Sequence, residues 1–156
     1  MKIYTFGAED APVLLLLPGT CCHWKSNFGA VIPLLADSFR VLCVSYDGFD
    51  ETEQTEFPTM LEETEKIEAY LKTHCGGHIR AAYGCSLGGA CLTRLLALGE
   101  ISVGRAIIDG GMTPYRLPFL VRKLLLARDV LSFRTVASNR EVLEAAFPPE
   151  RFLSLI

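Results

Sequence analysis

The sequence predicts an α/β domain in which a mostly parallel sheet is covered by helices on both faces. Two observations support this fold class. Four apolar runs have the length and composition of strands that are buried on both sides. Segments with helical periodicity alternate with these runs along the chain, and strand-helix alternation is typical of parallel sheets because parallel neighbours need a crossover between them.

The first half of the chain supplies two of these buried strands. The alternating segment from Lys2 to Phe6 predicts a half-exposed edge strand, and the continuous run from Pro12 to Leu17 predicts a strand buried on both faces. The apolar spacing between Trp24 and Phe39 predicts one helix with a kink at Pro33. Another buried strand is expected from Arg40 to Tyr46.

An acidic loop then leads into a second helix. Thr59 and Glu62 fit a capping box at its start, and Gly76 or Gly77 in "HCGG" can adopt the left-handed cap at its end. The remaining expected elements are a third buried strand, a helix that is apolar nearly all round, and a fourth buried strand, at residues 78–84, 87–99 and 104–111.

The character of the sequence changes after Gly111. The following residues contain no clear strand and are expected to form two or three helices separated by prolines. We therefore expect an α/β core over residues 1–112 and a helical segment over 113–156.

Composition argues against several classes of function. The chain has 156 residues and a net charge of -3, which argues against a nucleic-acid partner. Its longest apolar stretch, "APVLLLLP", is far shorter than the roughly 20 residues of a membrane helix, so a cytoplasmic protein without a membrane span is expected. The six cysteines form no C-x-x-C pair, and no metal or cofactor is expected.

The segment "YGCSLGGA" contains Ser86 in a G-x-S-x-G pattern between a predicted strand and a predicted helix. A serine on a sharp strand-to-helix turn needs glycines on both sides, because larger residues would clash there. This context indicates a catalytic nucleophile. The alternative is a structural serine that caps the helix.

A second motif, "PGT" at residues 18–20, ends the first buried strand. Acyl-transfer chemistry needs two hydrogen-bond donors aimed at the developing oxyanion. The backbone N–H groups of Leu87 and Thr20 are the candidates, and the alternative for the "PGT" loop is an ordinary turn.

With these motifs the chain resembles the α/β-hydrolase superfamily of serine esterases and lipases, closely over residues 1–112. The resemblance rests on "PGT", "YDGFD", "GCSLGG" and "DGG", and it implies an α/β-hydrolase core followed by a helical cap. Many relatives carry His-Gly where this chain has Pro18-Gly19, a difference that leaves the backbone donor intact. Relatives are longer, so the chain is expected to be the N-terminal part of such a protein.

Family members place an acid and then a histidine after the serine. The resemblance makes Asp109 a candidate acid, with a loop-capping aspartate as the alternative. All three histidines precede Ser86. His74 and His78 are expected at the opposite end of the sheet, and His23 is either an unusual base or a surface or pocket residue.

The resulting expectation is a hydrolase of a small apolar or acyl-containing ester or thioester, whose histidine base is absent from this chain. Trp24 and Phe119 are candidate substrate-binding residues. The alternative is a catalytically inactive binding or interaction protein with the same fold. A homodimer formed through an exposed sheet edge or the cap is also expected, because unpaired edges invite self-association.

Overall fold

The computed structural model describes residues 1–20, 22–111, 118–139 and 141. It divides the chain into two compact units, Met1–Pro114 and Tyr115–Ile156. Each unit is described here by itself.

The first unit is built on a five-stranded sheet with the order β1-β3-β2-β5-β7. The edge strand β1 is antiparallel to β3, and the other three pairings are parallel. The four parallel strands therefore end at the same edge of the sheet. The predicted fold class is confirmed. The bounds of the five strands are β1 (Lys2–Phe6), β2 (Val13–Leu17), β3 (Arg40–Ser45), β5 (Ala81–Cys85) and β7 (Ala106–Asp109).

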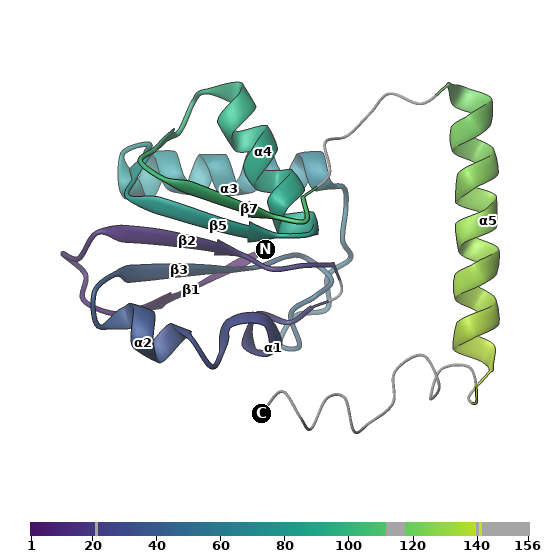
Figure 1. The fold of residues 1–156 in the computed structure, drawn as a ribbon, viewed down its shortest axis with the longest axis horizontal. Helices are drawn as coiled ribbons and strands as arrows, with labels where there is room; N and C mark the ends of the chain where they lie inside the picture. The colour runs from purple at the N-terminus through teal and green to yellow at the C-terminus, as the bar shows by residue number, and fades with distance from the viewer. Residues whose placement is uncertain (21, 112–117, 140, 142–156) are drawn as a thin grey trace. The chain divides into compact units, whose positions relative to one another are not determined.

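Helices cover both faces of the sheet, as Figure 1 shows. Helices α3 (Met60–Cys75) and α4 (Leu87–Leu98) pack on one face, and the short helices α1 (Trp24–Phe28) and α2 (Ile32–Ala36) pack on the other. Successive side chains of a strand point to opposite faces. In the central strand β2, Leu15 and Leu17 therefore join the core under α3 and α4, whereas Leu14 and Leu16 join the core under α1 and α2.

Residues at its own two ends determine where α3 begins and stops. The hydroxyl of Thr59 accepts a hydrogen bond from the backbone N–H of Glu62 at 3.1 Å, which satisfies one of the free donors of the first turn. Gly76 ends the helix with a φ of 61°, a left-handed conformation that glycine adopts at little cost. The predicted start and end of this helix are both confirmed.

The prediction of a single helix from Trp24 to Phe39 is wrong. The chain leaves the first helix after Phe28, and Val31 precedes a second helix that starts at Ile32. Pro33 lies in the first turn of this second helix instead of at a kink. A proline fits there because the first N–H groups of a helix have no intrahelical acceptor to lose.

The predicted third strand is divided in two. Its first residues form β4 (His78–Ile79), which pairs with β6 (Ser102–Val103) in a separate two-stranded sheet, and the rest form β5 of the main sheet. The fourth predicted strand, β7, forms as expected but is not buried. It lies at an edge of the main sheet, where Ile107 and Ile108 are 62% and 44% exposed.

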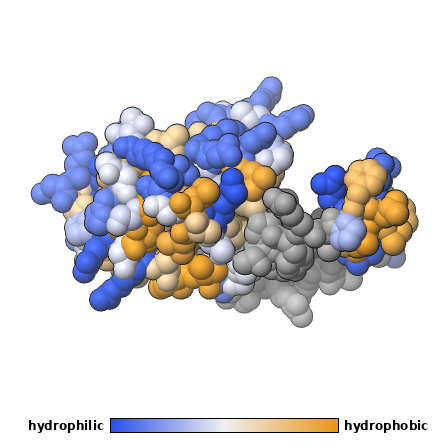
Figure 2. All heavy atoms as spheres, turned by 90° about the horizontal axis from the view of Figure 1, so that it is seen from above, coloured by the Kyte–Doolittle hydropathy of each residue, from blue (hydrophilic) through white to orange (hydrophobic). Residues whose placement is uncertain are grey.

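The second unit contains α5 (Phe119–Ser138), and the rest of the predicted helical segment lies largely outside the described residues. Apolar side chains are exposed along this helix, which lies on the right in Figure 2: Phe119, Leu120, Val121, Leu124, Leu126, Val130 and Leu131. Within the part of the chain that the structure describes, no helix combines the length and the apolar character needed to cross a membrane.

Candidate active site

Ser86 lies on a sharp turn between β5 and α4, at the carboxyl edge of the parallel strands. Its backbone has a φ of 50° and a ψ of -111°, and it is the only non-glycine residue with a positive φ among the described residues. A non-glycine residue in such a region is strained by about 1–3 kcal/mol, so the surrounding structure must enforce this geometry. The turn leaves Ser86 exposed, and its hydroxyl makes no capping bond to the helix.

The two glycines that flank Ser86 are required by close backbone contacts. A Cβ atom at Gly84 would lie 2.3 Å from the carbonyl oxygen of Gly88. A Cβ atom at Gly88 would lie 2.1 Å from the carbonyl oxygen of Leu17 at the end of β2. The tight turn therefore exists only because both positions lack a side chain.

Two backbone hydrogen bonds fasten the turn to its neighbours. The N–H of Ser86 donates to the carbonyl oxygen of Asp109 at 2.7 Å, and the N–H of Gly88 donates to the carbonyl oxygen of Pro18 at 3.1 Å. Pro18 also accepts a hydrogen bond from the hydroxyl of Tyr46 at 3.3 Å. The turn is thus bonded to the end of β7 on one side and to the "PGT" loop on the other.

The "PGT" loop runs directly beside Ser86. A Cβ atom built on Gly19 would lie 3.6 Å from the Cβ atom of Ser86. The N–H of Gly19 is already used, because it donates to the side-chain oxygen of Asn27 at 2.9 Å. The next residue, Thr20, is exposed beside this turn. Across from it, Leu87 is the first residue of α4, where backbone N–H groups have no acceptor within the helix.

Asp109 ends β7 beside Ser86, and its carboxylate accepts a hydrogen bond from the hydroxyl of Tyr83 at 2.7 Å. This bond and the nearby negative charge stabilise the protonated phenol. Together with partial burial they raise the pKa of Tyr83 from its ordinary value of 10.0 to about 12.

Asp109→Asn is therefore expected to lower the pKa of Tyr83 from about 12 toward 10.0, because the variant removes the negative charge that opposes phenolate formation. An absorbance titration of tyrosinate measures this shift, and Tyr83→Phe identifies which transition belongs to Tyr83. An unchanged high-pH transition in Asp109→Asn would show that the carboxylate does not control the phenol.

The comparisons with known proteins agree with this geometry. The profile of the alpha/beta hydrolase family matches residues 14–155. The chain belongs to the alpha/beta hydrolase family. A comparison with curated protein sequences found no significant match.

Solved structures of other alpha/beta hydrolases share the fold of this chain. A protein from Desulfitobacterium hafniense that is assigned to the family is 26% identical, with a TM-score of 0.66, and the match covers 71% of this chain and 44% of that one. A hydrolase from Pseudomonas aeruginosa is 21% identical with a TM-score of 0.68, over 98% of this chain and 61% of that one. An esterase from a Rhodococcus strain is 20% identical with a TM-score of 0.59, over 71% and 42% of the two chains.

This chain therefore spans 42% to 61% of the length of these three structures. The identities of 21% and 20% establish the shared fold and nothing about the substrate.

The rings of His23 and His74 contact residues other than Ser86. His23 is the N-cap of α1, where its Nδ1 atom accepts a hydrogen bond from the N–H of Lys25 at 3.3 Å. The ring of His74 stacks on Tyr70 with 4.1 Å between the centroids, and His78 begins β4. Among the described residues, no hydrogen bond joins any of these three rings to Ser86.

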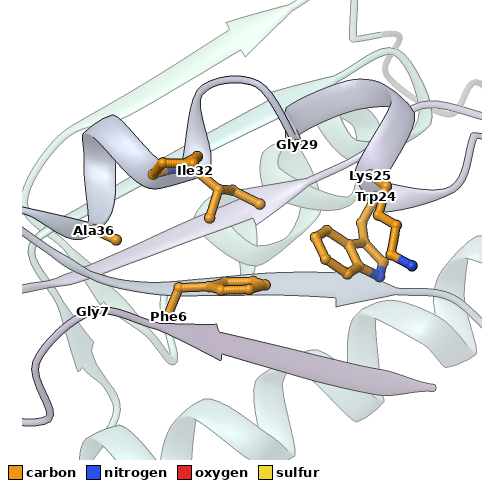
Figure 3. Close-up of a pocket in the computed structure, with 8 residues that line it drawn as sticks. Phe6, Gly7, Trp24, Lys25, Gly29, Ile32 and Ala36 are labelled. Carbon is orange, nitrogen blue, oxygen red and sulfur yellow. The ribbon is translucent and has the colours of Figure 1, made fainter.

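The two candidate substrate-binding residues lie in different surroundings. The indole of Trp24 is 8% exposed and packs against Tyr4 and Phe6 of β1, with 4.8 Å and 5.3 Å between the ring centroids. It lines a cavity of about 590 Å³. Figure 3 shows it beside Phe6 and Ile32. Since β1 and β5 are separated in the sheet by β3 and β2, this cavity is not the surface around Ser86.

Phe119 is the first residue of α5, in the second unit, where its ring contacts the charged groups of Arg122 and Lys123. Substrate binding by Trp24 and Phe119 stays a prediction.

Three side chains that support the site were not predicted from the sequence. They are Asn27, which binds the N–H of Gly19, Tyr46, which binds Pro18, and Tyr83, which binds Asp109. Each lies far along the chain from the residue that it contacts or in a different element. Local sequence patterns therefore carry no signal for these contacts.

Proposed function

We propose that this alpha/beta hydrolase is a serine hydrolase that uses Ser86 as its nucleophile on an ester or thioester carbonyl. The observation that carries the proposal is the strained, exposed conformation of Ser86 at the start of α4, with a φ of 50° that is held by bonds on both sides. Backbone strain of this kind is found where function requires a side chain to project from a fixed position.

In the proposed reaction the Oγ atom of Ser86 forms a bond to the carbonyl carbon, and the carbonyl π electrons move onto the oxygen. The N–H groups of Leu87 and Thr20 donate to this oxyanion. The hydroxyl proton passes to a base and then to the departing alcohol or thiol, and water later releases the acyl group from Ser86 by the same steps. The positive end of the α4 dipole also favours the oxyanion.

Among the described residues, no histidine forms a hydrogen bond with Ser86 as the base of this mechanism would. In a well-studied serine protease, loss of the base costs about a million-fold in turnover, and about 10³–10⁴ over water remains from the oxyanion hole and binding. We therefore propose that the base is supplied from outside these residues, with Asp109 as the candidate acid. The chain by itself is expected to react slowly.

The experiment that tests the proposal is labelling with a fluorophosphonate probe. Slow covalent labelling of the unsubstituted chain is expected, and Ser86→Ala should remove it. Ser102→Ala is the matched control, because Ser102 is also exposed but lies on β6 of the separate two-stranded sheet. Labelling that is absent, or that survives Ser86→Ala, would contradict an activated serine at this position.

A second candidate function is a binding or interaction protein that keeps the fold without catalysis. The engagement of His23 as a helix cap favours it, because this is the one histidine near the "PGT" loop. This alternative predicts that the unsubstituted chain is unlabelled.

A further inference from the structure

We propose that Cys22 and Cys85 are a redox-sensitive thiol pair, which a peroxide joins in a reversible disulfide that slows reaction at Ser86. Both cysteines are free thiols in this structure, and both are half-buried. Cys85 is the residue before Ser86, and Cys22 follows Thr20 of the "PGT" loop by two positions. The pair therefore joins the two segments of the candidate active site. The effect on Ser86 rests on the proposed function, whereas the disulfide itself does not.

The sheet holds Cys85 beside the "PGT" loop. Strands β2 and β5 are parallel neighbours (Figure 1), and Leu17 at the end of β2 pairs with Gly84. The next residues along the two strands, Pro18 and Cys85, are therefore neighbours as well, at a strand spacing of about 4.8 Å. A Cβ atom built on Gly19 would lie 3.8 Å from the carbonyl oxygen of Cys85. The loop thus begins directly beside this cysteine.

A turn brings Cys22 back toward the start of the same loop. The N–H of Cys22 donates to the carbonyl oxygen of Gly19 at 3.4 Å. A bond between residues three positions apart is typical of a β-turn, in which the first and last Cα atoms lie within about 7 Å of each other. Cys22 is therefore held close to the residue that lies beside Cys85. A disulfide needs Cα atoms about 4.4–6.8 Å apart, so only a small movement of the loop is required.

The two thiols are on the same face of the sheet. Side chains alternate along a strand, and Ala81 and Tyr83 of β5 pack against the core under α1 and α2. Cys85 follows this alternation and is directed to that face. Cys22 directly precedes His23, the N-cap of α1, and α1 covers the same face. Since both segments precede Ser86 and pack against each other, the pairing does not depend on a free surface.

The electrostatics of Cys85 agree with a thiol close by. Burial raises the pKa of the Cys85 thiol, and the charges of Asp109 and Cys22 raise this pKa further. A charge interaction of this kind falls off with distance, so the two sulfur atoms must be near each other. A thiol with a raised pKa stays protonated and is a poor first nucleophile. We therefore assign the first step of the oxidation to Cys22.

In this first step the Cys22 thiolate attacks one oxygen of hydrogen peroxide. The O–O bond breaks, and the departing hydroxide takes up the thiol proton as water, which leaves Cys22 as a sulfenic acid. The Cys85 sulfur then attacks the Cys22 sulfur and the S–O bond breaks. The second hydroxide takes up the Cys85 proton as water. Two thiols are thus oxidised to one disulfide while one peroxide is reduced to two waters.

The other thiols that the structure describes are placed differently. Cys43 and Cys91 are buried in the core. Cys75 is half-buried, but it ends α3 close to Arg40, the first residue of β3. The strands begin at that edge of the sheet, so Cys75 lies at the opposite edge from Cys85. Cys75 is therefore a matched control for the pair.

The disulfide should disturb the candidate oxyanion hole. An S–S bond is about 2.05 Å long, much shorter than the distance between two free sulfur atoms in contact, so the loop must move as the bond forms. Thr20 lies two residues before Cys22 and moves with it. Its N–H is one of the two proposed donors to the oxyanion, and loss of one such donor costs about 10²–10³ in turnover. Oxidation is therefore expected to slow attack by Ser86.

The first experiment locates the disulfide by mass spectrometry. The chain carries Cys21→Ser, because Cys21 lies outside the described residues and shares a tryptic peptide with Cys22. After hydrogen peroxide and alkylation of the remaining thiols, digestion without reductant should give peptide 3–25 joined to peptide 81–94. Fragmentation should place the bond at Cys85 and not at Cys91, and dithiothreitol should release the two peptides.

Variants of the same chain test which thiols are needed. Cys22→Ser and Cys85→Ser should each abolish the joined peptides. Cys75→Ser should leave them unchanged, because this thiol lies at the opposite edge of the sheet.

The second experiment measures fluorophosphonate labelling of the same samples. Peroxide should slow labelling at Ser86 about tenfold or more, and dithiothreitol should restore the original rate. In Cys22→Ser and in Cys85→Ser, the rate should be the same before and after peroxide, because neither variant can form the disulfide.

The two readouts fail separately. Absence of the joined peptides, or a bond from Cys22 to a cysteine other than Cys85, would overturn the thiol pair. Joined peptides in a chain whose labelling rate does not change would overturn the effect on Ser86. A reduced chain that is never labelled would overturn the proposed function and that effect with it, whereas the peptide map would still decide the disulfide.

Discussion

Gly88→Ala is expected to destabilise the chain by about 3 kcal/mol or more and to abolish labelling at Ser86. The added Cβ atom would lie 2.1 Å from the carbonyl oxygen and 2.5 Å from the carbonyl carbon of Leu17. Leu17 is fully buried at the end of the central strand, so neither backbone can move away without disturbing the core. The start of α4 would shift, and the N–H of Leu87 would shift with it.

Denaturant unfolding measures the loss of stability, and the fluorophosphonate probe measures the loss of labelling. The matched control is Gly99→Ala at the other end of α4. Gly99 has a φ of 72° but no atom within 4 Å of the added Cβ, so only the backbone strain remains, about 1 kcal/mol. Similar stabilities for the two variants would contradict a steric requirement at Gly88.

Lys66→Met is expected to lower the free energy of unfolding at neutral pH by about 1–3 kcal/mol. Lys66 donates to Glu63 at 2.6 Å and also contacts the carboxylate of Asp47. Glu63 is fully buried, and its other oxygen accepts the N–H of Asp47 at 3.3 Å. Removing the ammonium group leaves a buried carboxylate without its cation.

Lys72→Met is the matched control for this variant. Lys72 is 44% exposed, compared with 41% for Lys66, and it also joins two carboxylates, Glu68 and Glu100. Neither carboxylate is fully buried as Glu63 is, because Glu68 is 16% exposed and Glu100 is 58% exposed. Exposed ion pairs contribute little to stability, so Lys72→Met is expected to lower the free energy of unfolding by less than about 1 kcal/mol. Equal losses of unfolding free energy in Lys66→Met and Lys72→Met would show that the burial of Glu63 does not determine the effect.

The effect of Lys66→Met should depend on pH. Burial by itself would raise the pKa of Asp47, but hydrogen bonds from Lys66 and from the N-terminal ammonium outweigh burial and lower the pKa from 3.8 to about 2. A carboxylate with a depressed pKa contributes its stability above its unfolded value and loses it as the pH falls through the folded value. The difference in stability between the two proteins should therefore be largest above pH 4 and decrease toward pH 2, which acid titration of the unfolding transition measures.

The sequence predicted the parts of this molecule that depend on local patterns. The glycines around Ser86 and the "PGT" turn were identified because each motif is complete within a few residues. The start and end of α3 were predicted for the same reason, since Thr59 and Gly76 act on their own helix.

The wrong predictions concern interactions that a local pattern does not contain. The apolar spacing from Trp24 to Phe39 continues across a break that is visible only in the backbone bonds around Gly29. The run "AIID" is as apolar as a central strand, but its place at the sheet edge depends on the order of the strands.

The two backbone bonds that hold the turn at Ser86 also bear on how the chain folds. One bond comes from the end of β2, early in the sequence, and the other from the end of β7, well after the serine. Contacts between distant segments form slowly, because each requires closure of a long loop. The strained serine therefore reaches its final geometry only after both strands have joined the sheet. During synthesis, the turn at Ser86 cannot be complete until Asp109 has left the ribosome.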